Sequence, residues 1–113
     1  MNTTGNNKLI AEFMGIPSYE FRGYTMFEFE DDNHRTDVDL HYHTSWEWLM
    51  PVVVKIESRI GASIIIGRMF CEIKYTNPLN ESENFDVRMS SVLKINAVYS
   101  AVVEFIKWYN ENK

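Results

Sequence analysis

The stretch from Thr44 to Arg59, TSWEWLMPVVVKIESR, constrains the fold of this chain more than any other. Thr44 followed three residues later by Glu47 is a capping-box pattern, in which each side chain binds the backbone N–H of the other residue. Apolar residues then recur at intervals of three and four, which predicts a helix with one continuous apolar face. These residues are Trp46, Leu49, Met50, Val53, Ile56 and Ile60. Because further apolar residues flank this face, we expect a helix that is covered on two sides.

Pro51 leaves two interpretations of this stretch open. Inside a helix a proline removes one backbone hydrogen bond and clashes with the preceding turn, at a cost of about 3 kcal/mol. Either one kinked helix passes through Pro51, or a separate turn precedes a helix that begins there. The apolar pattern continues through Pro51 without a change of phase, so we expect one kinked helix. Gly61 is then the expected stop.

The remaining chain predicts two more helices and three or four strands. The expected helices span 7–14 and 91–110, and the expected strands span 24–30, 37–43, 62–66 and 69–76. The last two strands form a hairpin around a turn at Gly67 and Arg68, and 16–23 and 79–89 are expected to be irregular connections. This order predicts an α+β fold. We expect a small, mostly antiparallel sheet of three or four strands with about three helices packed on it in two layers.

Composition and charge limit the class of protein. A chain of 113 residues, 45% of them apolar, predicts a single domain, 1–113, with a core that needs no disulfide or metal. The net charge of −5 disfavours binding to nucleic-acid phosphates. The single cysteine, Cys71, favours a reducing cytoplasm. The first residues show no signal-peptide pattern, and no apolar run approaches the roughly 20 residues of a membrane span.

The pattern Asp37, Asp39, His41, His43 is the sharpest candidate for a chemical site. In a strand these four side chains share one face, and carboxylates with imidazoles suit zinc, manganese or iron. The alternative is the solvated face of an edge strand, because neighbouring side chains on one strand diverge and seldom converge on one ion. His43 also precedes the expected helix start, where it is either a general base or a packing residue.

Trp46 and Trp108 are the candidate partner-binding residues, for a protein partner or for self-association. Tryptophans on helices with strong apolar faces are either core residues or interface residues, and the acidic chain disfavours base stacking. Cys71 alternates within an apolar strand and is expected to be a buried structural thiol rather than a nucleophile. The sequence predicts no catalytic residue and no cofactor.

Three blocks of the sequence together resemble a known group of proteins. They are NKLIAEFMG (Asn7 to Gly15), YHTSWEWLMPVVVKIES (Tyr42 to Ser58) and AVYSAVVEFIKWYN (Ala97 to Asn110). They are similar to small proteins without assigned activity that phages, prophages and Bacteroidota-type bacteria encode. The resemblance implies a bacterial or phage cytosolic setting and transfers no catalytic residue.

Two functions of different classes follow from these observations. The first is a non-enzymatic accessory protein of phage or mobile-element type that binds a protein or a small ligand. The second is a small metal- or nucleotide-dependent enzyme built on the Asp37 to His43 face. An exposed tryptophan patch favours the first, and a deep pocket lined by the Asp/His residues favours the second.

Overall fold

The computed structural model describes residues 2–29, 34–80 and 83–112. In this part of the chain there are three α-helices and two three-stranded antiparallel sheets, so the predicted α+β class is confirmed. The helices are α1 (Thr3–Phe13), α2 (Trp46–Lys55), which continues as the π-helical turn η2 (Ile56–Ile60), and α3 (Lys94–Asn112). The strands are β1 (Ser18–Phe21), β2 (Tyr24–Glu28), β3 (His34–Thr36), β4 (Ser63–Ile66), β5 (Phe70–Thr76) and β6 (Asn84–Ser90), and a short 3-10 turn, η1 (Asp37–Asp39), follows β3.

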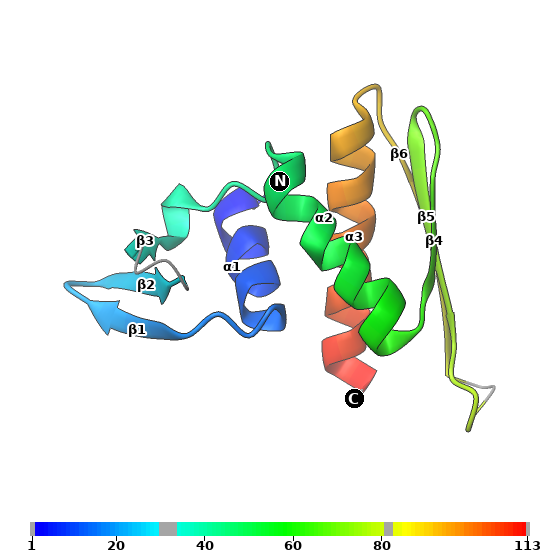
Figure 1. Ribbon diagram of the computed structural model, residues 1–113, viewed down its shortest axis with the longest axis horizontal. Coiled ribbons are helices and arrows are strands. Elements are labelled where there is room, and N and C mark those ends of the chain that lie inside the picture. Colours follow the sequence, from blue (N-terminus) through cyan, green and yellow to red (C-terminus); the bar gives the residue numbers. More distant parts are fainter. Residues whose placement is uncertain (1, 30–33, 81–82, 113) are drawn as a thin grey trace.

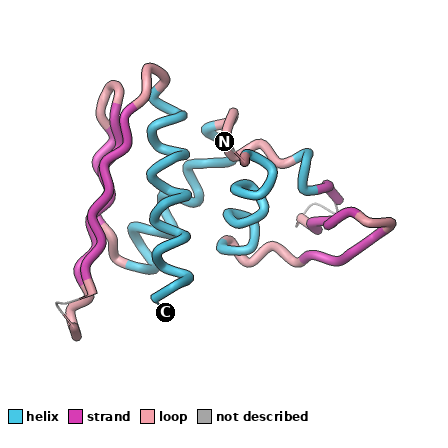
Figure 2. The backbone as a smooth tube through the Cα atoms, turned by 180° about the vertical axis from the view of Figure 1, so that it is seen from behind, coloured by secondary structure: helices cyan, strands magenta, loops and turns pink. Residues whose placement is uncertain are grey.

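The strands divide between two sheets, which corrects the expectation of one sheet carrying all the helices. One sheet has the order β1-β2-β3 and the other β4-β5-β6. Figure 1 shows α3 against one face of β4-β5-β6, with α1 on the far side of α3, α2 crossing α3 obliquely toward the start of β4, and the smaller sheet beyond α1. Figure 2 shows the same separation from behind. Each sheet is built from local antiparallel pairs, and the helices between them keep the sheets apart.

The helix that is covered on two sides is α3, not the helix of the Thr44 to Arg59 stretch. Its buried residues occupy most of its circumference: Ala97, Val98, Tyr99, Ala101, Val102, Val103, Phe105 and Ile106. It contacts β5 and β6 on one side and α1 on the other, and α2 crosses it (Figure 1). By contrast, α2 buries Leu49, Val52 and Val53. Trp46 and Met50, which were expected on the buried face of this helix, are exposed.

The two ends of the α2–η2 segment differ in how well they were predicted. The prediction of a capping box at Thr44 and Glu47 is wrong, because the N-cap residue is Ser45 and it makes no side-chain hydrogen bond. The N–H of Thr44 instead donates to the carbonyl of His41 at 3.2 Å. Pro51 lies inside α2, so the prediction of one helix is confirmed. At the other end Gly61 terminates the helical segment with a φ of 87°, as expected.

Several predicted boundaries are also wrong. The expected connection 16–23 contains β1, the expected loop 79–89 contains most of β6, and α1 begins at Thr3 rather than at residue 7. The β4–β5 hairpin is confirmed, but its turn lies one residue later than predicted, because the N–H of Gly67 donates to the carbonyl of Phe70 at 2.9 Å. Gly67 does not have a positive φ; a Cβ there would lie 2.0 Å from the Phe70 ring.

The buried apolar side chains form one cluster that includes residues of all three α-helices and of β2 and β5. Within the described residues no helix has both the length and the apolar character that crossing a bilayer requires.

Candidate functional site

The predicted metal-binding strand face does not form. Residues 37–39 are a 3-10 turn, in which successive side chains point about 120° apart, so Asp37 and Asp39 do not share a face. Asp39 lies 3.5 Å from His41 and 3.2 Å from Arg35. In residues 2–29, 34–80 and 83–112 no three or more His, Cys, Asp or Glu side chains are grouped to hold a metal. The structure therefore brings two of the four predicted ligands together, Asp39 and His41.

His43 belongs to a buried polar network. The side-chain amide of Asn7, which is 2% exposed, donates to the carbonyl of Leu40 and to Nδ1 of His43, both at 3.0 Å. The hydroxyl of Tyr99 donates to the carbonyl oxygen of the same amide at 3.0 Å. Burial raises the pKa of Tyr99 to about 12, so this donor keeps its proton at neutral pH. Through Asn7, this network joins α1 and α3 to the segment that precedes α2, and His43 is one of its members.

Cys71 is a fully buried free thiol on β5, as the sequence predicted. Burial raises its pKa to about 11. Because the thiolate is the reactive form, a thiol in this environment is inert at neutral pH.

The tryptophans have different environments. Trp108 is half-buried beside Phe85, Phe105 and Tyr75, with ring centroids 5.1, 6.0 and 5.6 Å away. These rings pack α3 on β5 and β6, so the environment of Trp108 is that of a packing residue. Trp46 is 38% exposed. Of the two predicted partner-binding residues, Trp46 is the more accessible.

Trp46 is part of an exposed apolar row on α2. Met50 and Val54 follow it at intervals of four residues and are 38% and 54% exposed. Residues four apart on a helix lie on successive turns of the same side. We call Trp46, Met50 and Val54 the α2 stripe. Met50 and Val54 are of the same apolar type as the buried residues of α2. The sequence pattern therefore does not show which of these residues face the solvent.

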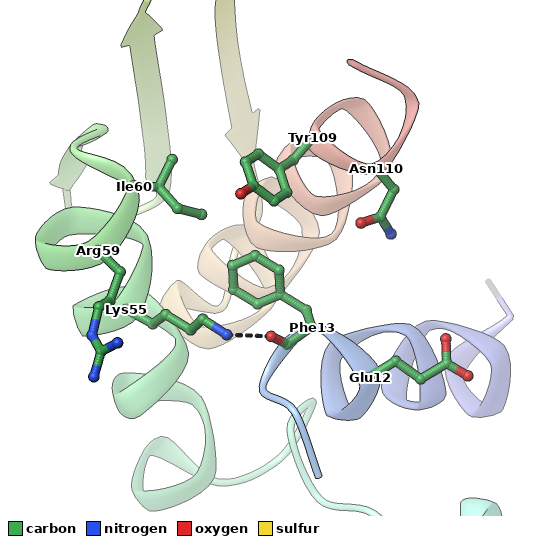
Figure 3. A pocket seen from close by; sticks show the side chains of 7 residues that line it. All are labelled: Glu12, Phe13, Lys55, Arg59, Ile60, Tyr109 and Asn110. Carbon is green, nitrogen blue, oxygen red and sulfur yellow. Dashed lines mark hydrogen bonds between the residues drawn. The ribbon is translucent and has the colours of Figure 1, made fainter. Parts of the chain in front are cut away.

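A pocket of about 570 Å³ lies where three helical segments end (Figure 3). It is lined by Glu12 and Phe13 at the end of α1, Lys55, Arg59 and Ile60 at the α2–η2 end, and Tyr109 and Asn110 near the end of α3. We call it the three-helix pocket. Its volume falls in the range of small-molecule sites, roughly 300 to 1,000 Å³.

Lys55 joins two walls of the three-helix pocket. Its ammonium donates to the backbone carbonyl of Phe13 and lies 4.6 Å from the centroid of the Phe13 ring (Figure 3). The rings of Phe13 and Tyr109 meet edge to face, with centroids 6.0 Å apart. The sequence analysis missed this pocket, because its residues come from three segments far apart in the chain and show no common spacing.

Comparison of the chain with protein-family models, with curated proteins and with solved structures gave no match. The function is therefore inferred from the geometry of this chain.

Proposed function

We propose that this chain is a non-enzymatic, cytoplasmic accessory protein of phage or mobile-element type, which acts by binding a protein partner through the α2 stripe. The observation that carries the proposal is the exposure of three large apolar side chains on successive turns of one helix, Trp46, Met50 and Val54.

The α2 stripe has the form of a helical recognition surface. Isolated exposed apolar residues are normal on proteins, but solvent-facing positions of a helix are ordinarily polar. Grooves that accept helices contact apolar residues spaced three or four apart, which is the spacing here. The other side of α2 is filled by Leu49, Val52 and Val53, so the stripe is not needed to attach α2 to the core.

The alternative enzyme on the Asp37 to His43 face has less support. Asp39 and His41 supply two ligands, and Asp39 is already paired with Arg35. A catalytic metal site normally has three protein ligands. We therefore propose the binding module alone.

Site-specific photocrosslinking tests the proposal. A benzophenone amino acid in place of Met50 puts the crosslinker in the middle of the α2 stripe, and the same residue in place of Glu104 is the control. Glu104 is exposed on α3, outside the stripe. Irradiation is performed on the purified protein and in the cells that naturally make it.

We expect a discrete covalent adduct from position 50 and none from position 104. An adduct of twice the chain mass in the purified protein identifies a second copy as the partner. An adduct found only in cells identifies a different protein. The absence of an adduct at position 50, or identical adducts at both positions, would overturn the proposal.

A further inference from the structure

We infer that one end of the β4-β5-β6 sheet binds the surface of an anionic lipid bilayer. The surface consists of two short segments, residues 67–70 at the turn from β4 into β5 and residues 91–94 between β6 and α3, which we call the paired loops. Binding of this kind lies on the membrane surface and needs no helix that crosses the bilayer. It is distinct from the α2 stripe and does not depend on it.

The sheet topology brings the paired loops together. In the antiparallel order β4-β5-β6, the turn between β4 and β5 and the end of β6 lie at the same end of the sheet. Phe70 is paired with Ser90, and the N–H of Ser91 donates to the carbonyl of Met69 at 2.9 Å. Figure 1 shows the two loops side by side at the top of the view, and Figure 2 shows the same arrangement from behind. The paired loops therefore form one continuous surface.

The paired loops expose three large apolar side chains. Met69 is 51% exposed, Val92 is 85% exposed and Leu93 is 59% exposed. Turns and loops are ordinarily polar, so apolar side chains on two adjacent loops indicate a surface that becomes covered. These side chains are carried by loops that project from one end of the molecule (Figure 1). A projecting apolar end can enter the boundary between lipid headgroups and acyl chains, whereas a protein partner would have to provide a matching cavity.

The charges around these side chains are positive. Arg68, Arg88 and Lys94 are exposed within or next to the paired loops. Residues 58–71 and 87–103 contain no acidic residue, although the whole chain has 16. The first acid beyond the turn, Glu72, lies 3.5 Å from Lys74. The surface is therefore complementary to anionic lipids, which attract clustered Lys and Arg side chains.

The net charge of the chain does not oppose this contact. At physiological ionic strength, exposed charges are screened over a Debye length of about 8 Å. The longest dimension of the molecule is 44 Å, so acidic residues far from the paired loops interact weakly with a bilayer at this end. The local charge, rather than the net charge of −5, decides the interaction.

A cleft between the paired loops suits a lipid headgroup. It has a volume of about 440 Å³ and is lined by Met69, Phe70, Arg88, Ser90, Ser91 and Val92. The Arg88 guanidinium lies 4.1 Å from the centroid of the Phe70 ring. A guanidinium has five N–H donors, so one that lies over a ring still presents N–H groups to a second partner. Together with the two serine hydroxyls, Arg88 provides donors for the phosphate of a headgroup.

Flotation of the purified full chain with lipid vesicles tests the inference. One set of vesicles contains only phosphatidylcholine, and the other contains phosphatidylcholine and phosphatidylglycerol in about equal amounts. We expect at least about tenfold stronger binding to the anionic vesicles, because three cations lie at the surface. This binding should weaken as the salt concentration rises.

Two variants separate the charged and the apolar contributions. Arg68→Gln should weaken binding to the anionic vesicles about fivefold, since it removes one cation near the membrane. The double variant Val92→Ser, Leu93→Ser should weaken it at least about tenfold, since it removes two apolar side chains from the lipid. The matched controls are Arg59→Gln, at the end of the α2–η2 segment, and Leu79→Ser, between β5 and β6 at the opposite end of the sheet. Both residues are exposed, and both controls should bind as the wild-type chain does.

Each outcome decides the inference. Binding that prefers anionic vesicles and is lost only in the paired-loop variants supports it. Absence of binding to anionic vesicles would overturn it in favour of a protein partner for these loops. Equal binding to both kinds of vesicle, equal losses in the controls, or a double serine variant that binds like the wild-type chain would also overturn it.

The paired-loop variants are expected to fold normally. The substituted side chains are already exposed, so their urea midpoints should match that of the wild-type chain. These midpoints are measured alongside the flotation, which separates a loss of membrane binding from a loss of folding.

Discussion

Asn7 shows how much of this fold depends on a single polar side chain. Its amide group is buried and satisfies Leu40, His43 and Tyr99 at once, so it joins α1 both to α3 and to the segment before α2. A buried hydrogen-bonding group that loses its partner keeps its desolvation penalty. Asn7 is therefore a structural residue, although asparagine in a helix is more often exposed.

Asn7→Ala should lower the free energy of unfolding by about 2 to 4 kcal/mol, since it leaves several buried polar groups without partners. Urea denaturation measures this change. Asn6→Ala is the matched control on the same helix, because Asn6 is not part of the network and alanine favours helix. Equal effects of the two substitutions would show that the Asn7 network contributes nothing specific.

Tyr42 and Tyr99 predict how stability depends on alkaline pH. Burial raises the pKa of each from 10.0 to about 12. Between these values the unfolded chain loses the phenolic protons while the folded chain keeps them. Stability is therefore fully present below pH 10 and falls as the pH rises toward 12. Cys71 acts in the same direction from pH 9 to about 11.

Tyr42→Phe removes one of these protons and should make the loss of stability above pH 10 less steep. Urea midpoints measured at a series of pH values test this expectation. A variant whose stability falls as steeply as that of the wild-type chain would show that Tyr42 ionises alike in the folded and unfolded states.

Single residues were predictable where one local rule decides their state. Gly61 ends its helix because it adopts a positive φ, and Cys71 is buried because it alternates with polar residues in a strand. The strand predicted from Asp37 to His43 is wrong, because polar and apolar residues can also alternate where a 3-10 turn follows a strand. The polar role of Asn7 depends on residues 33 to 92 positions away, which no local rule contains.

Among the elements, α2 combines features that ordinarily conflict. It contains Pro51, buries one apolar face and exposes the α2 stripe. Its cap and its last turn are both unusual, since Ser45 makes no side-chain cap and η2 is π-helical. Packing against α3 therefore contributes more to this helix than its own local preferences do.

Pro51→Ala should raise the free energy of unfolding by about 1 to 3 kcal/mol. The substitution restores a backbone donor and removes a clash, and Pro51 is exposed, so little packing is lost. Pro17→Ala, at a proline outside any helix, should bring no such gain. Chemical denaturation of both variants checks the expectation, and a less stable Pro51→Ala protein would contradict it.

The strands show which elements the sequence reveals. The β4–β5 hairpin was predicted because two apolar runs flank a short turn. β6 was not predicted, although Phe85, Val87 and Met89 alternate with polar residues, because the polar composition of residues 79–89 is also typical of an irregular loop. β1 is exposed along its whole length although Tyr19 and Phe21 alternate with polar residues, so it buries no face and forms through its pairing with β2.

For the whole molecule, the arrangement of elements was less predictable than their type. The class follows from local patterns, but the division into two sheets depends on α3 lying between β4-β5-β6 and α1. The three-helix pocket has the same origin, because it exists only where three helical segments end together. The α2 stripe likewise became visible only when the buried side of α2 was known. The surfaces on which a function can be proposed therefore depend on contacts between segments that are far apart in the sequence.

The proposal requires that the two sides of α2 have different roles: the buried side packs in the core, and the α2 stripe binds a partner. The free energy of unfolding of a Met50→Gln, Val54→Gln double variant tests this directly, with Leu49→Ala as the comparison on the same helix. We expect the double variant to lose less than about 1 kcal/mol, because its side chains already contact water. Leu49→Ala should lose about 2 to 5 kcal/mol. A double variant as destabilised as Leu49→Ala would show that the stripe serves folding and would contradict its role as a binding surface.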